Sequence, residues 1–188
     1  YILYMLMTIA IVMYSCASGN EVAYLKTNKV MEVVTTSIKP LPFYLGVTLS
    51  IGLTGLIQLV GIVVCFVASY QLSGVDLSSL SSLGVTLSPL QPHEIAAFLL
   101  LFLGGFLLYS FINTAIASIV NSNDDLTTTL VPVEMLAMVQ FFVSIFALQA
   151  DSTLTMACSY IPFTAPAVMF VRYMIGFAGV GELALSLV

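Results

Sequence analysis

The side chains best suited to catalysis or metal binding in this sequence are few and widely separated. The one histidine, His93, stands in a loop next to Glu94, and the paired acids Asp124 and Asp125 follow Asn123. A histidine can act as a general base or metal ligand, and paired aspartates can hold a magnesium–phosphate group. Both patterns are more simply explained as helix starts, where Asn123 caps the helix and acids favour the helix dipole. We therefore predict no catalytic residue and no metal site.

The other reactive side chains also predict neither a catalytic residue nor a metal site. Cys16, Cys65 and Cys158 are isolated thiols without metal-ligand spacing, and the first two lie in apolar runs where small packing residues are expected. The sequence carries no G-x-x-x-x-G-K-[ST] phosphate loop. An intramembrane enzyme would need a nucleophile–base pair or a metal set, and these residues supply neither.

Charge gathers instead in one polar interval, Gly19 to Pro40, with the sequence GNEVAYLKTNKVMEVVTTSIKP. It holds three of the four basic residues of the chain, Lys26, Lys29 and Lys39. Basic residues decide the orientation of membrane segments, so we expect this interval on the cytoplasmic side.

The same interval is expected to form an amphipathic helix over residues 20–38. Asn20 can cap it, Glu21 lies in its first turn, and Pro40 ends it. At about 100° per residue, one side collects the apolar stripe Val22, Ala23, Val30, Val33 and Val34. Another side collects the acid–amide face, which consists of Glu21, Asn28 and Glu32. Two interpretations stay open: a helix that only anchors the chain at the membrane interface, or a face that contacts a cytosolic partner.

The composition indicates an integral membrane protein. Hydrophobic residues make up 60% of the chain and charged residues 7%, with a mean hydropathy of +1.12. A soluble chain carries about 25% charged residues. The lipid bilayer is therefore an expected partner, whereas nucleic acid is not, because the basic patch that it requires is missing.

Apolar runs predict an all-α polytopic bundle with spans at residues 1–18, 43–70, 95–120 and 130–150. The start of a last span is expected at 181–188. Both ends of the chain fall inside apolar runs, so we expect a fragment of a longer protein. With residues 19–40 inside, the connection 71–93 is expected outside, 121–125 inside, and Asp151 outside.

The segment from residue 154 to 173 is open to two interpretations. A full span over 154–171 would place Arg172 inside, as the positive-inside rule favours. However, Pro162 and Pro166 would each cost about 3 kcal/mol in a helix interior. We therefore expect a broken, re-entrant segment that enters and leaves on the outer side.

Among the polar residues within the expected spans, Gln58, Asn113, Glu134 and Gln140 are the candidates for a transport role. Each could line a transport pathway, and an intramembrane acid such as Glu134 is a functional candidate by default. The alternatives are interhelical hydrogen bonding for Gln58, helix packing for Asn113, and a position at the membrane interface for Glu134.

Two strings in this sequence resemble signatures of type-2 ABC transporter permeases, especially the NatB-like sodium-efflux branch. EVAYLKTNKVMEV, from Glu21 to Val33, is similar to E-x-A-x-x-K-x-[NS]-[RK]-V-M-E-[VI]. YIPFTAPAVMFVR, from Tyr160 to Arg172, is similar to the S-x-[IL]-P-[FL]-[TS]-[SA]-P-x-x-M-x-x-R segment of the same permeases. The strings occur in the family's order, and the resemblance covers nearly the whole chain.

The resemblance implies the permease subunit of an ATP-driven exporter in the plasma membrane of a bacterium. ATP and magnesium would bind a separate ATPase subunit, and a second permease copy or a related subunit would complete the path. The residues that would couple to the ATPase are Glu21, Lys26, Asn28, Lys29, Met31 and Glu32. The cargo could be sodium, a drug, a peptide or a lipid. The alternative function is a secondary transporter driven by an ion gradient, for which Glu134 is the one suitable acid.

Overall fold

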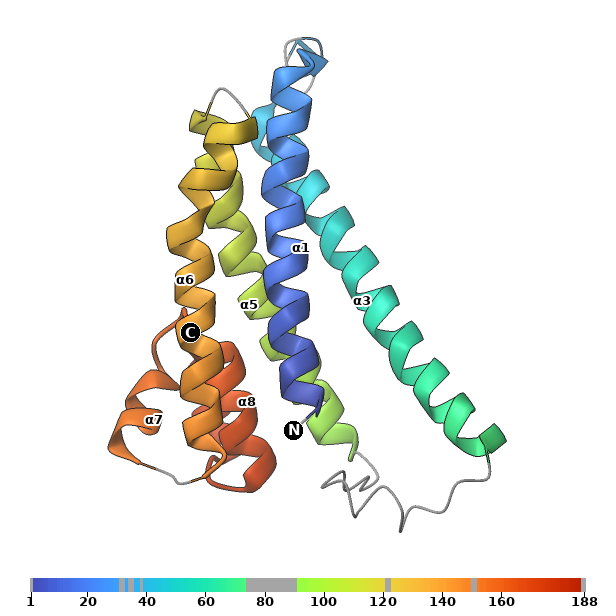
Figure 1. The fold of residues 1–188 in the computed structure, drawn as a ribbon, viewed down its shortest axis with the longest axis vertical. Coiled ribbons are helices and arrows are strands. Elements are labelled where there is room, and N and C mark those ends of the chain that lie inside the picture. The colour runs from blue at the N-terminus through green and yellow to red at the C-terminus, as the bar shows by residue number, and fades with distance from the viewer. Residues whose placement is uncertain are drawn as a thin grey trace.

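A computed structural model describes residues 2–30, 33, 36–37, 39–73, 91–120, 123–149 and 152–186. Regular structure over these residues is helical throughout (Figure 1). The helices are α1 (Ile2–Thr27), α3 (Pro40–Ser73), α5 (Pro92–Ile119), α6 (Asn123–Ala147), α7 (Thr153–Cys158), α8 (Ala165–Ile175) and α9 (Val180–Ser186).

Four of these helices are long and apolar enough to cross a membrane, which needs about 20 residues. The qualifying stretches are Leu3–Thr27, Leu41–Ile62, His93–Ile119 and Thr128–Ala147. They run alternately in opposite directions, and α1 lies between α3 and α6 in the view of Figure 1. The prediction of a polytopic helical bundle is thus confirmed.

The core forms where α1, α5, α6 and α8 meet. Met7 and Ile11 of α1, Phe102 and Phe106 of α5, and Val168 of α8 are almost completely buried. Helix α3 starts beside the other long helices but diverges from α1 toward its C-terminal end (Figure 1). Its exposed side chains there are largely apolar, as expected for a surface that faces lipid.

Gly105 permits the closest contact in this core. A Cβ atom built there would lie 2.8 Å from Pro166 Cγ and 2.9 Å from Ile11 Cδ1. A larger residue would therefore push α5 away from both α8 and α1. This glycine thus allows three helices to approach at one point, as small residues do where membrane helices pack.

The predicted helix boundary at Asn20 is wrong. Helix α1 continues without a break from the first span through Asn20 to Thr27, so residues 20–27 are not a separate helix. Beyond Asn20, Val22 and Ala23 are still buried against α5 and α6. This packing outweighs the capping preference of one asparagine, which is worth about 1 kcal/mol.

The segment predicted to be broken is indeed two short helices joined by a turn. Pro162 lies in the turn between α7 and α8, and Pro166 lies in the first turn of α8, where proline is tolerated. Helix α8 has 11 residues, about 16 Å, which is too short to span a bilayer.

Aromatic contacts show the direction in which α8 runs. Pro166 approaches Gly105, Phe170 packs on Phe98 with ring centroids 5.6 Å apart, and Tyr173 packs on His93 at 6.0 Å. As α8 advances, its partners on α5 move back toward the start of that helix. Helices α7 and α8 therefore form a hairpin that enters the bundle from the end where α5 begins and returns to it. That this end faces outward stays a prediction.

Candidate functional site

The first candidate site lies at the end of the bundle where α1 and α5 end and α3 and α6 begin (Figure 1). Val22 and Ala23 of α1 pack there with Ala117 of α5 and Leu130 of α6. Tyr44 of α3 packs against the same cluster. A small apolar cluster, which includes the first residues of the polar interval, thus joins the four long helices.

Lys26 fixes the end of α5. Its Nζ donates hydrogen bonds to the carbonyl oxygens of Ser118, at 2.7 Å, and Val120, at 2.8 Å. The last carbonyls of a helix lack partners within the helix and carry its negative dipole end, so a lysine stabilises them. Because only residues 120–122 separate α5 from α6, and Lys26 contacts the carbonyl of Val120, the end of α1 is linked through Lys26 to both helices.

Glu21 and Asn28 are exposed at the same end. The Asn28 side chain donates to the carbonyl of Tyr24 at 3.1 Å, which extends the end of α1. Lys29 follows with φ of 57°, a left-handed conformation that costs a non-glycine residue about 1–2 kcal/mol. The chain therefore turns sharply directly after α1, in the middle of the interval predicted to be one helix.

The predicted apolar stripe is only partly correct. Val22 is fully buried, but Val30 and Val33 are 38% and 71% exposed, so they do not hold the segment against the bundle. Their backbone is helical. Met31, Glu32 and Val34 lie outside the described residues, and their coupling and packing roles stay predictions.

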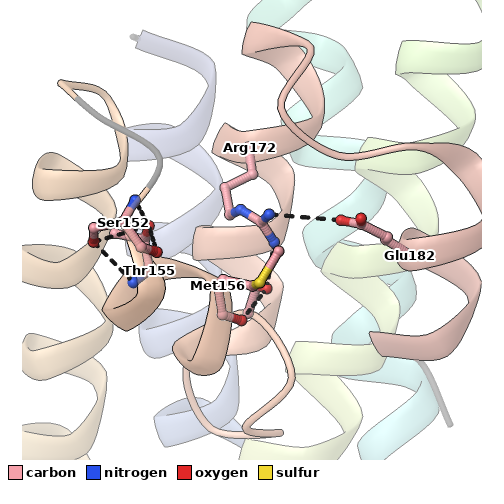
Figure 2. Close-up of polar contacts among 6 residues, drawn as sticks. Ser152, Thr155, Met156, Arg172 and Glu182 are labelled. Atoms are coloured by element: carbon pink, nitrogen blue, oxygen red, sulfur yellow. Dashed lines mark hydrogen bonds and ion pairs between the residues drawn. The ribbon is translucent and has the colours of Figure 1, made fainter.

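The second candidate site is the hairpin, where Arg172 is completely buried. Its Nη1 donates to Ser159 Oγ at 2.7 Å. Its Nη2 lies 3.6 Å from Glu182 Oε2 of α9 (Figure 2). Arg172 thereby joins α8 to the turn after α7 and to α9. At the start of α7, Ser152 and Thr155 exchange capping hydrogen bonds (Figure 2).

Pro162, Pro166 and Arg172 all lie in the hairpin, and their role in a re-entrant segment stays a prediction. Sequence reasoning missed Glu182. One signal could have found it: a lone arginine in an apolar segment needs an anion, and Glu182 is the acid nearest to Arg172 in the sequence.

Tyr109 was also missed, and it attaches the hairpin to the bundle. Its hydroxyl donates to the carbonyl of Phe163 at 2.8 Å, and Gln140 Oε1 lies 3.3 Å from the same hydroxyl oxygen. Gln140 is 1% exposed, so this contact places it in the packing between α5, α6 and the hairpin.

The other three predicted pathway residues surround α1. The hydroxyl of Tyr14 donates to Gln58 Oε1 of α3, and Cys16 Sγ donates to Glu134 Oε1 of α6 at 3.6 Å. Asn113 of α5 is buried, and its Nδ2 lies 3.9 Å from Cys16 Sγ. Gln58, Asn113 and Glu134 therefore each contact α1, whereas Gln140 belongs to the hairpin contact.

Two further predictions from single residues have definite outcomes. His93 is exposed in the first turn of α5, which Gln91 and Glu94 cap, and this agrees with the helix-start interpretation. Cys65 is exposed, so its predicted packing role within this chain is wrong, and Cys16 and Cys158 are half-buried.

Comparisons with known proteins identify a family. The family model described as "ABC-2 family transporter protein" matches residues 1–188. The chain is also 29% identical over 175 residues to the uncharacterized protein YhaP of Bacillus subtilis strain 168. That alignment covers 92% of this chain but 42% of YhaP, so the chain spans less than half the length of this relative. No solved structure is significantly similar to the chain.

Proposed function

We propose, from the premise that this chain belongs to the ABC-2 transporter family, that it is the permease of an ATP-driven exporter. Membership makes it a multi-pass membrane permease of an ABC transporter, and the four apolar helices agree with that role. We further propose the direction of transport, which is export, its coupling to ATP hydrolysis, and the cargo that is carried. The proposed location is a bacterial plasma membrane, and the relative in Bacillus subtilis supports the bacterial part of this proposal.

The observation that carries the proposal is the contact of Lys26 with the last carbonyls of α5. A partner that binds the polar interval would act directly on the end of α1, which continues as one helix of 26 residues through the bundle. Through Lys26 it would also act on the ends of α5 and, across residues 121–122, α6. Binding energy at this end can therefore favour one arrangement of the helices over another.

The proposed partner at this end is a separate ATPase subunit that binds ATP and magnesium. It would contact Glu21 and Asn28, which are exposed, together with Lys29 at the sharp turn. Met31 and Glu32 would complete the contact. Lys26 would act differently from these residues, since its Nζ is already engaged with α5 and would pass the movement on.

A second permease copy or a related subunit would complete the translocation path. The outer surface of α6, where Met135, Met138, Phe142 and Phe146 are all more than half exposed, would face either that subunit or lipid. The cargo is proposed to be sodium, in line with the NatB-like resemblance, or alternatively a drug, peptide or lipid. Transport driven by an ion gradient is the alternative mechanism, and the exposed acid Glu134 within α6 is the observation in its favour.

Charge reversal at Glu32 tests the docking proposal. In the variant Glu32→Lys, the basic group expected on the ATPase would lose its acidic partner and meet a like charge, which weakens association by about 2–5 kcal/mol. We expect normal membrane insertion, loss of the co-purifying ATPase and loss of export. The measurement is the amount of ATPase retained by the tagged permease in mild detergent.

Glu94→Lys is the matched control, because it makes the same charge change at the opposite end of the bundle. It should retain the ATPase. If Glu32→Lys inserts, binds the ATPase and exports like the unmodified protein, the polar interval is only an interfacial anchor.

A further inference from the structure

Polar side chains flank the exposed face of α1 on both sides, at the same level along the bundle. On one flank, the Tyr14 hydroxyl donates to Gln58 of α3; on the other, Cys16 Sγ lies 3.6 Å from Glu134 Oε1 of α6. Tyr14 and Cys16 are two residues apart, about 3 Å along the helix axis. Both Gln58 and Glu134 are exposed. Between them α1 exposes Met13 and Ala17. We call Tyr14, Cys16, Gln58 and Glu134 the polar belt.

The whole polar belt falls within the apolar stretches that can cross a membrane. Tyr14 and Cys16 belong to Leu3–Thr27, Gln58 to Leu41–Ile62, and Glu134 to Thr128–Ala147. Ionisable side chains within membrane spans are expensive to place against lipid, and they face a bundle interior or a water-filled cavity. A glutamate and a glutamine exposed at the same depth indicate that this surface faces water rather than lipid.

The charge of Glu134 is not balanced by a basic side chain within the part of the chain that the structure describes. Among the described residues, the Glu134 carboxylate accepts a hydrogen bond from the thiol of Cys16. Two of the basic residues are engaged elsewhere, Lys26 with the end of α5 and Arg172 with Ser159 and Glu182. The belt thus carries a net negative charge.

A second, buried acceptor adjoins the same sulfur atom. Asn113 is 1% exposed, its Nδ2 lies 3.9 Å from Cys16 Sγ, and its Oδ1 is buried without a hydrogen-bond partner among the described residues. Polar groups therefore continue from the exposed carboxylate of Glu134 past Cys16 toward the interior of the bundle. An asparagine with an unpartnered carbonyl oxygen and a glutamate, both in contact with Cys16, suit a positively charged ligand.

We propose that the polar belt lines a water-filled path and that Glu134 makes this path selective for cationic cargo. The inference deepens the proposed function and rests on it for the existence of a cargo. The charge of Glu134 would attract a metal cation or a cationic group of a larger molecule, and the hydroxyl and amide of Tyr14 and Gln58 would provide polar contacts on the opposite flank. Contact of the belt with water is measurable without any transport assay.

The test uses the native thiol of Cys16 as a probe of water and charge. In the whole protein with Cys65→Ser and Cys158→Ser, membranes are treated with cationic and anionic methanethiosulfonates of similar size. We expect both reagents to modify Cys16 and the cationic one to react about ten times faster, because a unit charge a few ångströms away can produce such a ratio. Glu134→Gln should bring the ratio to about one, and Glu134→Asp should preserve it.

A control cysteine at Leu136 distinguishes a water-filled path from lipid. Leu136 is 42% exposed and lies about 200° around α6 from Glu134. With Cys16 also replaced by serine, Leu136→Cys should resist both charged reagents and react with a membrane-permeant maleimide.

Two results would overturn the inference. If Cys16 resists both charged reagents, as Leu136→Cys is expected to, the belt does not face water. If Cys16 reacts with both at equal rates, or if the preference for the cationic reagent survives Glu134→Gln, Glu134 does not select charge. Either result in a permease that retains its ATPase would leave the proposed function intact, so the two failures are distinguishable.

Discussion

The buried guanidinium of Arg172 shows how a single residue organises the hairpin. A cation with no exposed surface needs hydrogen bonds and an anion nearby, since an unpaired buried charge is strongly unfavourable. Ser159 and Glu182 meet part of that need, and they come from the turn after α7 and from α9. The same contacts explain how the chain can place Arg172 apart from the three lysines. The positive-inside rule predicts that those lysines lie in the cytosol.

Glu182→Gln should destabilise the protein. It leaves the Arg172 guanidinium without the acidic partner at 3.6 Å, while Ser159 stays in place. The side chain of Glu182 is 35% exposed, so water reduces the loss below that of a fully buried pair. We expect about 1–2 kcal/mol, in the range of a hydrogen bond to a charged group. Thermal unfolding in detergent measures this change.

Glu21→Gln serves as the comparison for stability, because Glu21 is exposed at the opposite end of the bundle. It should unfold at the temperature of the unmodified protein. Equal unfolding temperatures for Glu182→Gln and Glu21→Gln would show that the contact between Arg172 and Glu182 does not hold α9 to the hairpin.

At the scale of elements, the hairpin is held by close packing as much as by polar contacts. Gly105 lets Pro166 and Ile11 approach α5, and Tyr109 binds the carbonyl at the tip of the hairpin. Each of these contacts joins the hairpin to a long helix. The hairpin should therefore move with the bundle and not as an independent flap.

Gly105→Leu should displace the hairpin from α5. Even one added carbon would lie under 3.0 Å from Pro166 and Ile11, and overpacking of this kind costs about 1–3 kcal/mol. The half-buried thiol of Cys158, at the end of α7, should then react faster with a maleimide. Gly46→Leu is the matched control, because a Cβ atom at Gly46 meets nothing within 4 Å. An unchanged rate at Cys158 in Gly105→Leu would contradict this packing account.

The sequence was sufficient for features that depend on local composition. Apolar length predicted the four long helices, and Pro162 and Pro166 predicted the break between α7 and α8. It was insufficient where contacts between distant segments decide the outcome. The burial of Val22 against α5 keeps α1 helical through Asn20, and no local pattern in that interval reveals it.

In the candidate sites, too, local features could be predicted and contacts between distant segments could not. The motif residues Lys26 and Arg172 were recognisable from the sequence, but their partners were not. Lys26 contacts carbonyls more than 90 residues away, and backbone acceptors leave no trace in residue types. From the sequence alone, Tyr109 cannot be distinguished from the other tyrosines in the apolar spans. Its contact with Phe163 is visible only in the structure.

At the scale of the whole molecule, α1 joins the proposed docking end to the rest of the bundle. It extends for 26 residues, about 39 Å, and packs against α3, α5, α6 and α8 along that length. The polar belt lies midway along α1, and the hairpin lies toward its other end. A force at the polar interval can thus reach both features through one continuous helix.

The orientation of this helix in the membrane is the central claim, because the ATPase contact, the path and the outer hairpin all depend on it. Thr27 and His93 are exposed at opposite ends of the bundle, so single cysteines there report on the two sides of the membrane. With the native cysteines replaced by serine, intact cells are treated with an impermeant maleimide and then permeabilised. We predict that His93→Cys is labelled in intact cells and that Thr27→Cys is labelled only after permeabilisation. Labelling of Thr27→Cys in intact cells, with His93→Cys protected, would contradict it.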